Sequence, residues 1–518
     1  MKEYKLLWVD DEIDLLTPHK IFLEEKGYDV SFLNNGTDAV EEIKRNHFDI
    51  IFLDENMPGL SGLETLDLMK RINPTIPIVM ITKNEEEDIM DQAIGGKIAD
   101  YLIKPVKPNQ ILLSLKKNIE KARLEREKTT VAYRSDFNSL GQLINQANSF
   151  EEWVNVYKQL VFWELELSGS FDVAMEQIFK MQKNEANNQF SRFVSKNYVD
   201  WVNEEDDDAP ILSNKLFKEK LFPLTKEGDN IFVILIDNLR YDQWKVLYNE
   251  ILSEYYNIVD EEIYCAILPS TTQYARNSLF AGLMPYDIQQ KLPHYWVNED
   301  KDDHKNEFEK ELLEEQLRRN NYDYKVFYEK VLNSRYGKKL LNIIPQILEN
   351  EIAVIVYNFV DILSHARTEN KMIRDLANDE AAYRSLTISW FEHSELKELI
   401  RRLSKRGVKV VVTTDHGSIR TQDPIKVVGD KETTTNLRYK TGKNLGYNEK
   451  ELFVIDNPHS IKLPKLNVSS KFIFAKKDDF LIYPTNYNYF VNYYRNTFQH
   501  GGISMEELLI PFVELAPK

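Results

Sequence analysis

Short apolar runs that lead directly to an aspartate are the feature of this sequence that most limits its fold. Residues 5–9 lead to Asp10, residues 49–53 lead to Asp54, and residues 231–236 lead to Asp237. Uninterrupted apolar strands are typical of parallel sheets that are covered on both faces. Because the active sites of such sheets lie at the carboxyl ends of the strands, these aspartates are candidate functional residues.

The N-terminal part of the chain alternates strand-length and helix-length segments. We predict strands at 5–9, 29–33, 49–53, 78–81 and 101–103, and helices at 15–26 and 37–46. Such alternation predicts a doubly wound, flavodoxin-like parallel sheet. We therefore expect a first α/β domain over residues 1–120.

The middle of the chain has a different pattern. From about residue 109 to residue 201, Gly and Pro are scarce and apolar residues recur at helical spacing, as at Leu140, Leu143 and Ile144. This pattern predicts a helical bundle that connects two domains, over residues 121–208. The acidic run 204–208 is interpreted as a solvated linker. Apolar strands return at 231–236, 353–360 and 408–412, so residues 209–518 are expected to form a second α/β domain.

Charge and cysteine content exclude several classes of function. The chain has 66 Lys and Arg against 83 Asp and Glu, a formal net charge of −17. This balance disfavours binding to duplex DNA or to anionic membranes. The single cysteine, Cys265, excludes a disulfide framework and a cysteine-rich zinc site. The N-terminus has no signal-peptide pattern and no apolar run is long enough to span a bilayer, so we expect a cytoplasmic protein.

Five residues at predicted strand ends of the first domain combine into one candidate site: Asp10, Asp11, Asp54, Thr82 and Lys104. Three carboxylates close together favour a bound hard cation, and Mg²⁺ keeps water positions that a phosphate can share. A hydroxyl and an ammonium group beside them can bind phosphoryl oxygens. Lys104 precedes Pro105, a bond that is often cis in turns of this kind.

These residues, in this order and spacing, resemble the receiver domain of bacterial response regulators. The resemblance implies that a sensor histidine kinase phosphorylates Asp54. It also implies a Mg²⁺ site formed by Asp10, Asp11, Asp54 and the Asn56 carbonyl. Thr82 and Tyr101 look like the switch pair of this family. Lys83 is a departure, because a small residue is usual at that position.

Carboxylates and imidazoles mark the strand ends of the C-terminal half: Asp237, Asp361, His365, Asp415, His416 and His500. Oxygen and nitrogen ligands without thiolates suit Zn²⁺ or Mn²⁺ in an open catalytic site. Residues 361 and 365 are four apart, so a helical turn would place both on one face. A hydroxyl of Thr271 or Thr272 stands before a predicted helix that ends near Gly282. It either caps that helix or acts as a nucleophile beside a metal.

The order of these motifs resembles the PglZ-type branch of the alkaline phosphatase superfamily. The resemblance implies two zinc ions per chain, with Mn²⁺ as the other option. One would be held by Asp361, His365 and His500, and the second by Asp237, Asp415, His416 and the nucleophile. Alignment of residues 268–282 with the phosphodiesterase branch places the nucleophile at Thr272, with Thr271 as the alternative. Residues 285–350 are expected to form a family-specific insertion or cap.

The combination of both domains resembles response regulators with a PglZ-type effector domain that control type IX secretion. It implies a zinc-dependent phosphodiesterase that acts on nucleotides or short oligonucleotides and forms a homodimer on phosphorylation. Partners implied are a sigma factor and a secretion component. Two other readings stay open: a metal-stabilised interaction regulator without essential catalysis, and a phosphomonoesterase or phosphotransferase. The aromatic stretch 483–494 either stacks on bases or packs in the protein.

Overall fold

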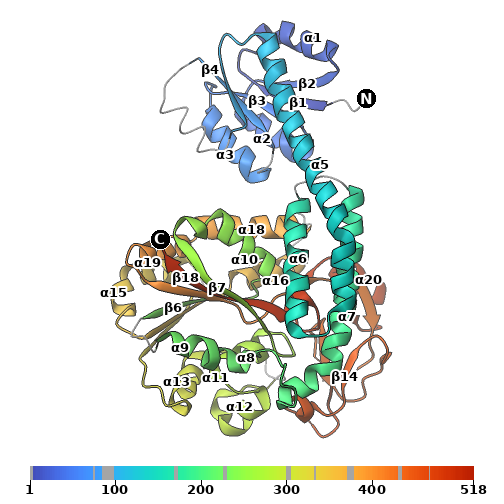
Figure 1. Ribbon diagram of the computed structural model, residues 1–518, viewed down its shortest axis with the longest axis vertical. Coiled ribbons are helices and arrows are strands. Elements are labelled where there is room, and N and C mark those ends of the chain that lie inside the picture. Colours follow the sequence, from blue (N-terminus) through green and yellow to red (C-terminus); the bar gives the residue numbers. More distant parts are fainter. Residues whose placement is uncertain are drawn as a thin grey trace. The chain divides into compact units, whose positions relative to one another are not determined.

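The computed structural model describes residues 4–73, 76–83, 98–168, 173–225, 230–298, 305–331, 334–369, 379–429, 434–465 and 467–518. The chain divides into two compact units (Figure 1). The first contains the N-terminal residues up to Ser135, and the second begins at Asp136 and contains the C-terminus. The division falls within one long helix, α5 (Pro108–Gln146).

A five-stranded parallel sheet forms the centre of the first unit. Its strands, in the spatial order β2-β1-β3-β4-β5, are β2 (Tyr28–Leu33), β1 (Tyr4–Val9), β3 (Ile50–Asp54), β4 (Ile78–Thr82) and β5 (Asp100–Ile103). The helices are α1 (Thr17–Glu25), α2 (Gly36–Arg45), α3 (Gly62–Ile72) and the first part of α5, after a short turn η1 (Ile13–Leu16). The predicted doubly wound fold is therefore confirmed.

Alternate residues of the strands build two separate apolar cores, one on each face of this sheet. Leu7 and Val9 belong to one core, and Leu6 and Trp8 belong to the other. This arrangement follows from the strand period of two residues. In β3 and β4 the only polar side chain is that of the last residue, at the edge of the sheet where the candidate acids lie.

The helical connector belongs to the second unit. It contains the end of α5, α6 (Phe150–Ser168) and α7 (Val173–Asn203). Trp153 of α6 packs edge-on against Phe190 of α7, with ring centroids 5.6 Å apart. The predicted helical region is confirmed.

A six-stranded sheet forms the core of the second unit. In the order β7-β18-β10-β6-β9-β8, the strands are β7 (Tyr256–Cys265), β18 (Leu509–Pro517), β10 (Lys409–Thr413), β6 (Ile231–Ile236), β9 (Ile352–Tyr357) and β8 (Val326–Val331). The four strands from β10 to β8 are parallel, and β18 runs antiparallel to both of its neighbours. Helices α10 and α18 lie on one face, and α9, α11 and α13 lie on the other (Figure 1).

The remaining helices in the described part of this unit have between 4 and 14 residues. They are α8 (Ser213–Leu216), α9 (Phe222–Thr225), α10 (Tyr241–Glu250), α11 (Asn277–Ala281), α12 (Pro285–Lys291), α13 (Glu309–Arg319), α14 (Ser334–Asn342), α15 (Ile344–Ile347), α16 (Phe359–Glu369), α18 (Glu380–His393), α19 (Glu395–Ser404), α20 (Tyr487–Tyr494) and α21 (Met505–Leu508). Short turns such as η4 (Thr272–Arg276) lie between them.

Two expectations from the sequence are wrong here. The strand predicted at 353–360 ends at Tyr357, and Asp361 lies in the first turn of α16 rather than at a strand end. Residues 285–350 are not only an insertion or cap, because they supply β8, the edge strand of the central sheet. All residues of β8 except Val331 are partly exposed, so this strand lacks the continuous apolar run that identified the buried strands.

Three small sheets complete the unit. They are formed by β11 (Ile419–Arg420) with β17 (Phe498–Gln499), by β12 (Asp423–Lys426) with β16 (Asp479–Ile482), and by β13 (Tyr439–Gly442), β15 (Lys471–Phe474) and β14 (Phe453–Ile455). The pairing of β11 with β17 matters for the site. It brings the chain just after His416 beside the chain just before His500.

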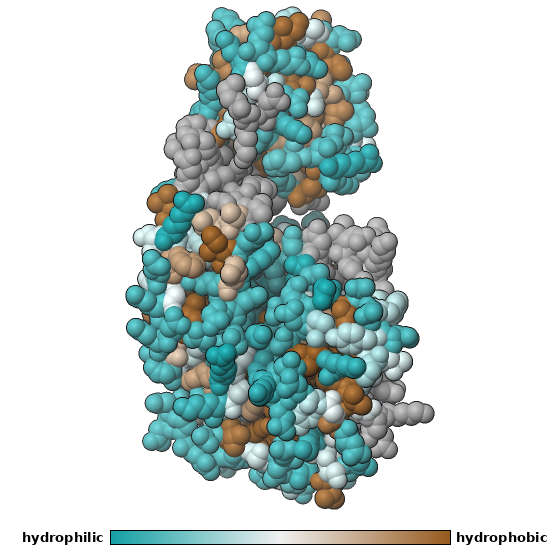
Figure 2. Space-filling model, turned by 90° about the vertical axis from the view of Figure 1, so that its right-hand side faces the viewer, coloured by the Kyte–Doolittle hydropathy of each residue, from teal (hydrophilic) through white to brown (hydrophobic). Residues whose placement is uncertain are grey.

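No described helix is long and apolar enough to cross a lipid bilayer. On the face visible in Figure 2, hydrophobic residues are scattered among hydrophilic ones and do not form one broad band.

Candidate phosphoacceptor and metal sites

The acids of the receiver site converge at the carboxyl edge of the first sheet. Asp10, Asp11 and Asp54 each offer a carboxylate oxygen, and these oxygens lie within 4.8 Å of one another. The Lys104 Nζ atom is 2.9 Å from Asp10 Oδ2 and 2.8 Å from Asp54 Oδ1. Burial raises the pKa of Asp54 to about 6, and the charges of the two neighbouring acids add to this rise, whereas Lys104 opposes it. A cation at this edge would remove that repulsion.

The residues expected to respond to a phosphoryl group lie next to these acids. Thr82 ends β4, is fully buried, and its hydroxyl donates a hydrogen bond to the Glu55 carboxylate. Burial raises the pKa of Tyr101, and a hydrogen bond with Thr82 opposes that rise.

Asn56 is exposed just after β3. Lys83 pairs at 3.2 Å with an exposed acid, Glu12. The peptide bond between Lys104 and Pro105 is cis.

The first carboxylate–imidazole group of the second unit contains Asp361, His365 and His500. Its ligand atoms lie within 4.8 Å of one another. His365 Nε2 is 3.5 Å from Asp361 Oδ2, because both residues lie one turn apart on α16. His500 Nε2 is 3.5 Å from the other oxygen of the same carboxylate.

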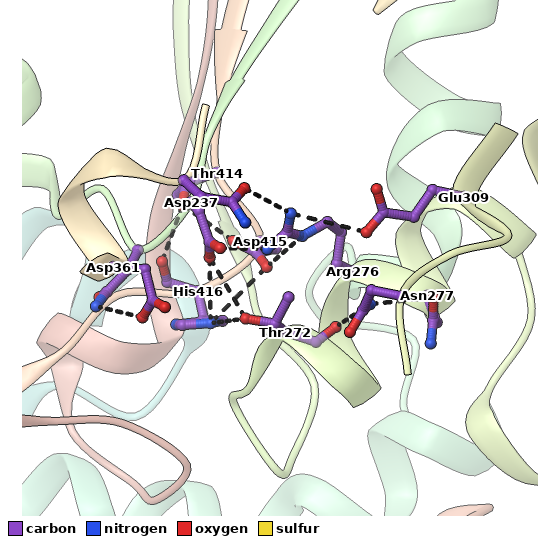
Figure 3. A network of polar contacts seen from close by, with 12 residues as sticks. Asp237, Thr272, Arg276, Asn277, Glu309, Asp361, Thr414, Asp415 and His416 are labelled. Atoms are coloured by element: carbon purple, nitrogen blue, oxygen red, sulfur yellow. Dashed lines mark hydrogen bonds and ion pairs between the residues drawn. The ribbon is translucent and has the colours of Figure 1, made fainter. Parts of the chain in front are cut away.

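The second group contains Asp237, Asp415 and His416, all fully buried, again within 4.8 Å of one another. Thr272, at the start of η4, lies against it (Figure 3). Its Oγ1 atom is 3.4 Å from Asp237 Oδ1 and 3.2 Å from His416 Nε2. In contrast, the buried hydroxyl of Thr271 has no hydrogen-bond partner among the described residues.

The two groups are neighbours. The rings of His416 and His500 stack with their centroids 4.3 Å apart. Carboxylates and imidazoles without thiolates are the donor set that suits zinc or manganese. In addition, the Nδ1 atom of His500 is buried without a hydrogen-bond partner among the described residues, so a lone pair or a proton there is unsatisfied. The side chains present therefore fit a pair of divalent cations.

The pKa values of the second unit's site shift in both directions. Burial would lower the pKa of His500, but its hydrogen bond with Asp361 raises it above its usual value. Burial lowers the pKa of His416 to about 4, and the neighbouring His500 adds to this shift, so its imidazole is neutral at pH 7, as a metal ligand must be. Burial also raises the pKa of Asp237, with further repulsion from Asp415 and Asp361. Burial alone would raise the pKa of Asp361, but the hydrogen bond from His500 holds it well below its usual value.

Sequence reasoning missed one residue at the centre of this site. The guanidinium of Arg276 is fully buried and bonds to both Asp237 and Asp415 (Figure 3). The available signal was its spacing, since it lies four residues after Thr272, one turn further along the same segment. Glu309 and Asn358, which contact Arg276, were missed as well.

The aromatic stretch near the C-terminus forms helix α20 and packs in part. Tyr487, Phe490 and Tyr494 pack against a buried cluster that includes Phe480. Tyr489 remains 63% exposed. Packing therefore accounts for three of these aromatic rings, and stacking of bases on the others stays a prediction.

Family comparisons define the class of protein. Residues 6–116 match the response regulator receiver domain. Residues 216–515, more than half of the chain, match the BREX system PglZ alkaline phosphatase-like domain, and the chain belongs to this family. It is a two-component response regulator with an alkaline phosphatase-like effector domain. More particularly, residues 123–202 match the PorX response regulator linker domain, so the chain has the domain combination of a PorX-like regulator.

Similar proteins match over a limited part of the chain. The transcriptional regulatory protein ZraR of Klebsiella oxytoca is 31% identical over 140 residues, 27% of this chain and 32% of that protein. ResD of Bacillus subtilis is 32% identical over 120 residues, 23% and 50% of the two chains. A receiver domain structure from Clostridium thermocellum is 28% identical and covers 23% of this chain and 98% of its own, with a TM-score of 0.23. The chain thus spans half or less of these curated relatives.

Proposed function

We propose that this chain is a response regulator phosphorylated on Asp54 whose effector domain is a metal-dependent phosphodiesterase for nucleotides or short oligonucleotides. The observation that carries the proposal is the hydroxyl of Thr272, which lies against one of two neighbouring carboxylate–imidazole groups. We propose domain limits of 1–120, 121–208 and 209–518.

Each residue of the effector site has a proposed task. Asp361, His365 and His500 would hold one zinc or manganese ion, and Asp237, Asp415 and His416 with Thr272 would hold the other. Such ions supply Lewis-acid stabilisation of the negative charge that develops on a phosphate. Thr272 is the proposed nucleophile. Its hydroxyl lies 3.4 Å from Asp237 Oδ1 and 3.2 Å from His416 Nε2, and these contacts support the proposal that it is oriented for attack on a phosphate.

A pair of threonine variants tests the diesterase proposal. Thr272→Val deletes a hydroxyl and keeps the shape, and Thr271→Val is the matched control on the neighbouring residue. With zinc or manganese present, we expect the wild type and Thr271→Val to cleave phosphodiesters and short oligonucleotides faster than phosphomonoesters. We expect Thr272→Val to lose at least about 1,000-fold in kcat, as expected for a lost covalent nucleophile.

Other results of this assay would favour the other readings. Faster cleavage of monoesters would indicate a phosphatase or phosphotransferase. A folded, metal-loaded protein that cleaves none of these substrates would indicate an interaction regulator that contacts a sigma factor or a type IX secretion component. The proposed secretion role rests on the match of residues 123–202 to the PorX linker domain.

The receiver part of the proposal has its own test. A sensor histidine kinase is the expected phosphate donor, and Mg²⁺ held by Asp10, Asp11, Asp54 and the Asn56 carbonyl would assist. Thr82 and Tyr101 would then rearrange, and we propose that the protein forms a homodimer. Light scattering with beryllofluoride, an acyl-phosphate mimic, should show a doubled mass at micromolar protein. An unchanged mass with bound mimic would contradict the dimer.

A further inference from the structure

Arg276 is a fully buried cation beside the proposed nucleophile. Its Nε atom donates a hydrogen bond to Asp415 Oδ2 at 3.0 Å, and its Nη2 atom donates one to Asp237 Oδ2. Its Nη1 atom donates a bond of 3.3 Å to the side-chain oxygen of Asn358. The three acceptors follow β10, β6 and β9, which are adjacent in the central sheet. One guanidinium therefore bonds to residues at the carboxyl ends of three neighbouring strands. Figure 3 shows its contacts with Asp237 and Asp415.

Arg276 bonds to only one of the two carboxylate oxygens of Asp237. Arg276 takes Oδ2, whereas Oδ1 faces Thr272 Oγ1 and lies 3.7 Å from His416 Nε2. For Asp415, the Oδ2 atom that accepts from Arg276 also lies 3.8 Å from His416 Nε2. A carboxylate oxygen can accept more than one bond, so both acids can hold the arginine and a cation at once.

Arg276 also controls the turn that carries Thr272. The two residues are the first and last of η4, so a guanidinium bonded to two strand ends fixes that turn against the sheet. A planar fork with several fixed donors does this better than a point charge, which is the physical difference between arginine and lysine.

Glu309 lies on the side of the guanidinium opposite Asp237 and Asp415 (Figure 3). It is fully buried at the start of α13, and its Oε1 atom is 3.7 Å from Arg276 Nη1. Its other oxygen accepts a hydrogen bond from the Tyr328 hydroxyl and pairs with Lys330 at 3.1 Å. Both partners belong to β8, so the segment that resembled an insertion provides an anchor for Arg276.

We propose that Arg276 is a positioning residue that presents Asp237 and Asp415 to a divalent cation and holds Thr272 in line, and that Glu309 fixes the direction of its guanidinium. This inference deepens the proposed function and rests on it. Its opposite is that Arg276 merely stands in for a cation and leaves when the cation binds. The two ideas predict opposite changes in cation affinity when Arg276 is replaced. A positioning residue strengthens cation binding, so its loss lowers the affinity, whereas a stand-in competes with the cation, so its loss raises the affinity.

Zinc affinity of the full-length chain separates the two ideas. It is measured by competition with a chromogenic chelator, and kcat and KM are measured on the same samples. The variants are Arg276→Met, Arg276→Lys and Glu309→Gln. The control is Arg384→Met, which removes another buried arginine whose ion pairs, with Glu164 and Asp242, lie outside the site.

We expect Arg276→Met to bind one zinc ion 10- to 100-fold more weakly than the wild type and the other with nearly unchanged affinity, since residues that orient ligands have effects of this size. Its kcat should fall with little change in KM. Arg276→Lys should recover part of both losses, and Glu309→Gln should lose about 10-fold in affinity. Arg384→Met should change zinc affinity less than threefold, even if its thermal stability falls.

Equal or tighter zinc binding in Arg276→Met overturns the proposal. If that variant does not fold, Arg276→Lys and Glu309→Gln decide in its place, and wild-type affinity in both overturns it. If the zinc-loaded wild type cleaves no diester, the proposed function fails. The affinity series still decides whether Arg276 positions the ligands, so the two failures are distinguishable.

Discussion

Asn187 of helix α7 offers a sharp test of how the helical connector is joined to the effector domain. Its side-chain oxygen accepts a hydrogen bond of 2.8 Å from the Met505 backbone N–H, and its Nδ2 atom donates one of 3.0 Å to Glu506 Oε2. Both Asn187 and Glu506 are 3% exposed. These bonds fasten the connector to the segment that follows His500.

The variant Asn187→Leu keeps the approximate volume and removes both bonds. The Met505 N–H loses its acceptor in a buried place, which costs about 1–3 kcal/mol. The lost bond to the Glu506 carboxylate adds about 1.5–3 kcal/mol. Lys183 still pairs with that carboxylate at 2.9 Å, and burial of the leucine offsets about 1 kcal/mol, so we expect a net loss of about 3 kcal/mol.

Differential scanning calorimetry on the full chain measures this loss. The relevant transition is the one that we expect added zinc to shift to higher temperature, because it would report unfolding of the proposed metal-binding domain. A loss of about 3 kcal/mol should lower its midpoint by about 5 °C. Asn184→Leu is the matched control, since Asn184 lies on the same helix but is exposed. Equal midpoints for the two variants would refute the reasoning, because the connector would then contribute nothing through Asn187.

Three further predictions concern single residues. Asp54→Asn should abolish labelling by acetyl phosphate in the presence of Mg²⁺, and persistent labelling would place the phosphoacceptor elsewhere. His500→Ala should reduce the zinc content of the purified protein from about two ions to about one per chain, by elemental analysis. Burial lowers the pKa of Lys440 to about 7, whereas lysine in an unfolded chain has a pKa of about 10.4. Between these two pH values the unfolded chain binds more protons than the folded chain, so the free energy of unfolding rises with pH. Wild-type stability should therefore gain about 2 kcal/mol over Lys440→Met from pH 7 to pH 9, and parallel pH profiles in urea unfolding would contradict this.

The strands that carry the acids could be predicted because each is a local signal. A buried parallel strand such as β6 is continuously apolar, and the first polar residue after it, Asp237, stands at the edge of the sheet. Asp361 is the exception. After the last strand residue, Tyr357, a single polar residue, Asn358, is followed by the apolar residues 359 and 360 in the first turn of α16, and this pattern does not mark where the strand ends and the helix starts.

What could not be predicted depends on contacts between distant parts of the chain. Glu309 approaches Arg276 only because β8 joins the sheet beside β9, and β8 has no apolar run to identify it. His500 approaches His416 only through the short pairing of β11 with β17. Neither pairing leaves a periodic pattern in the sequence. The candidate ligands could therefore be named from the sequence, but the contacts that support Arg276 could not.

The connector is hydrogen-bonded to the chain after His500, and that chain is hydrogen-bonded in turn to the chain after His416, which limits how a signal can reach the site. The Ser191 hydroxyl of α7 donates to the Ile503 carbonyl at 3.1 Å, and the Gly417 N–H donates to the Glu507 carbonyl at 3.2 Å. A displacement of α7 therefore acts on the chain after His500 and, through residue 507, on the chain after His416.

A signal such as phosphorylation can shift an equilibrium between two conformations only by the difference in free energy that it makes between them. If the Asn187 contacts are made in one state and broken in the other, their loss of about 3 kcal/mol corresponds to roughly a 100-fold change in population. Phosphorylation of Asp54 that changed diester hydrolysis by much more than this would need further contacts to differ between the states. A change in assembly without any change in hydrolysis would instead mean that α7 and residues 503–506 move together as one body.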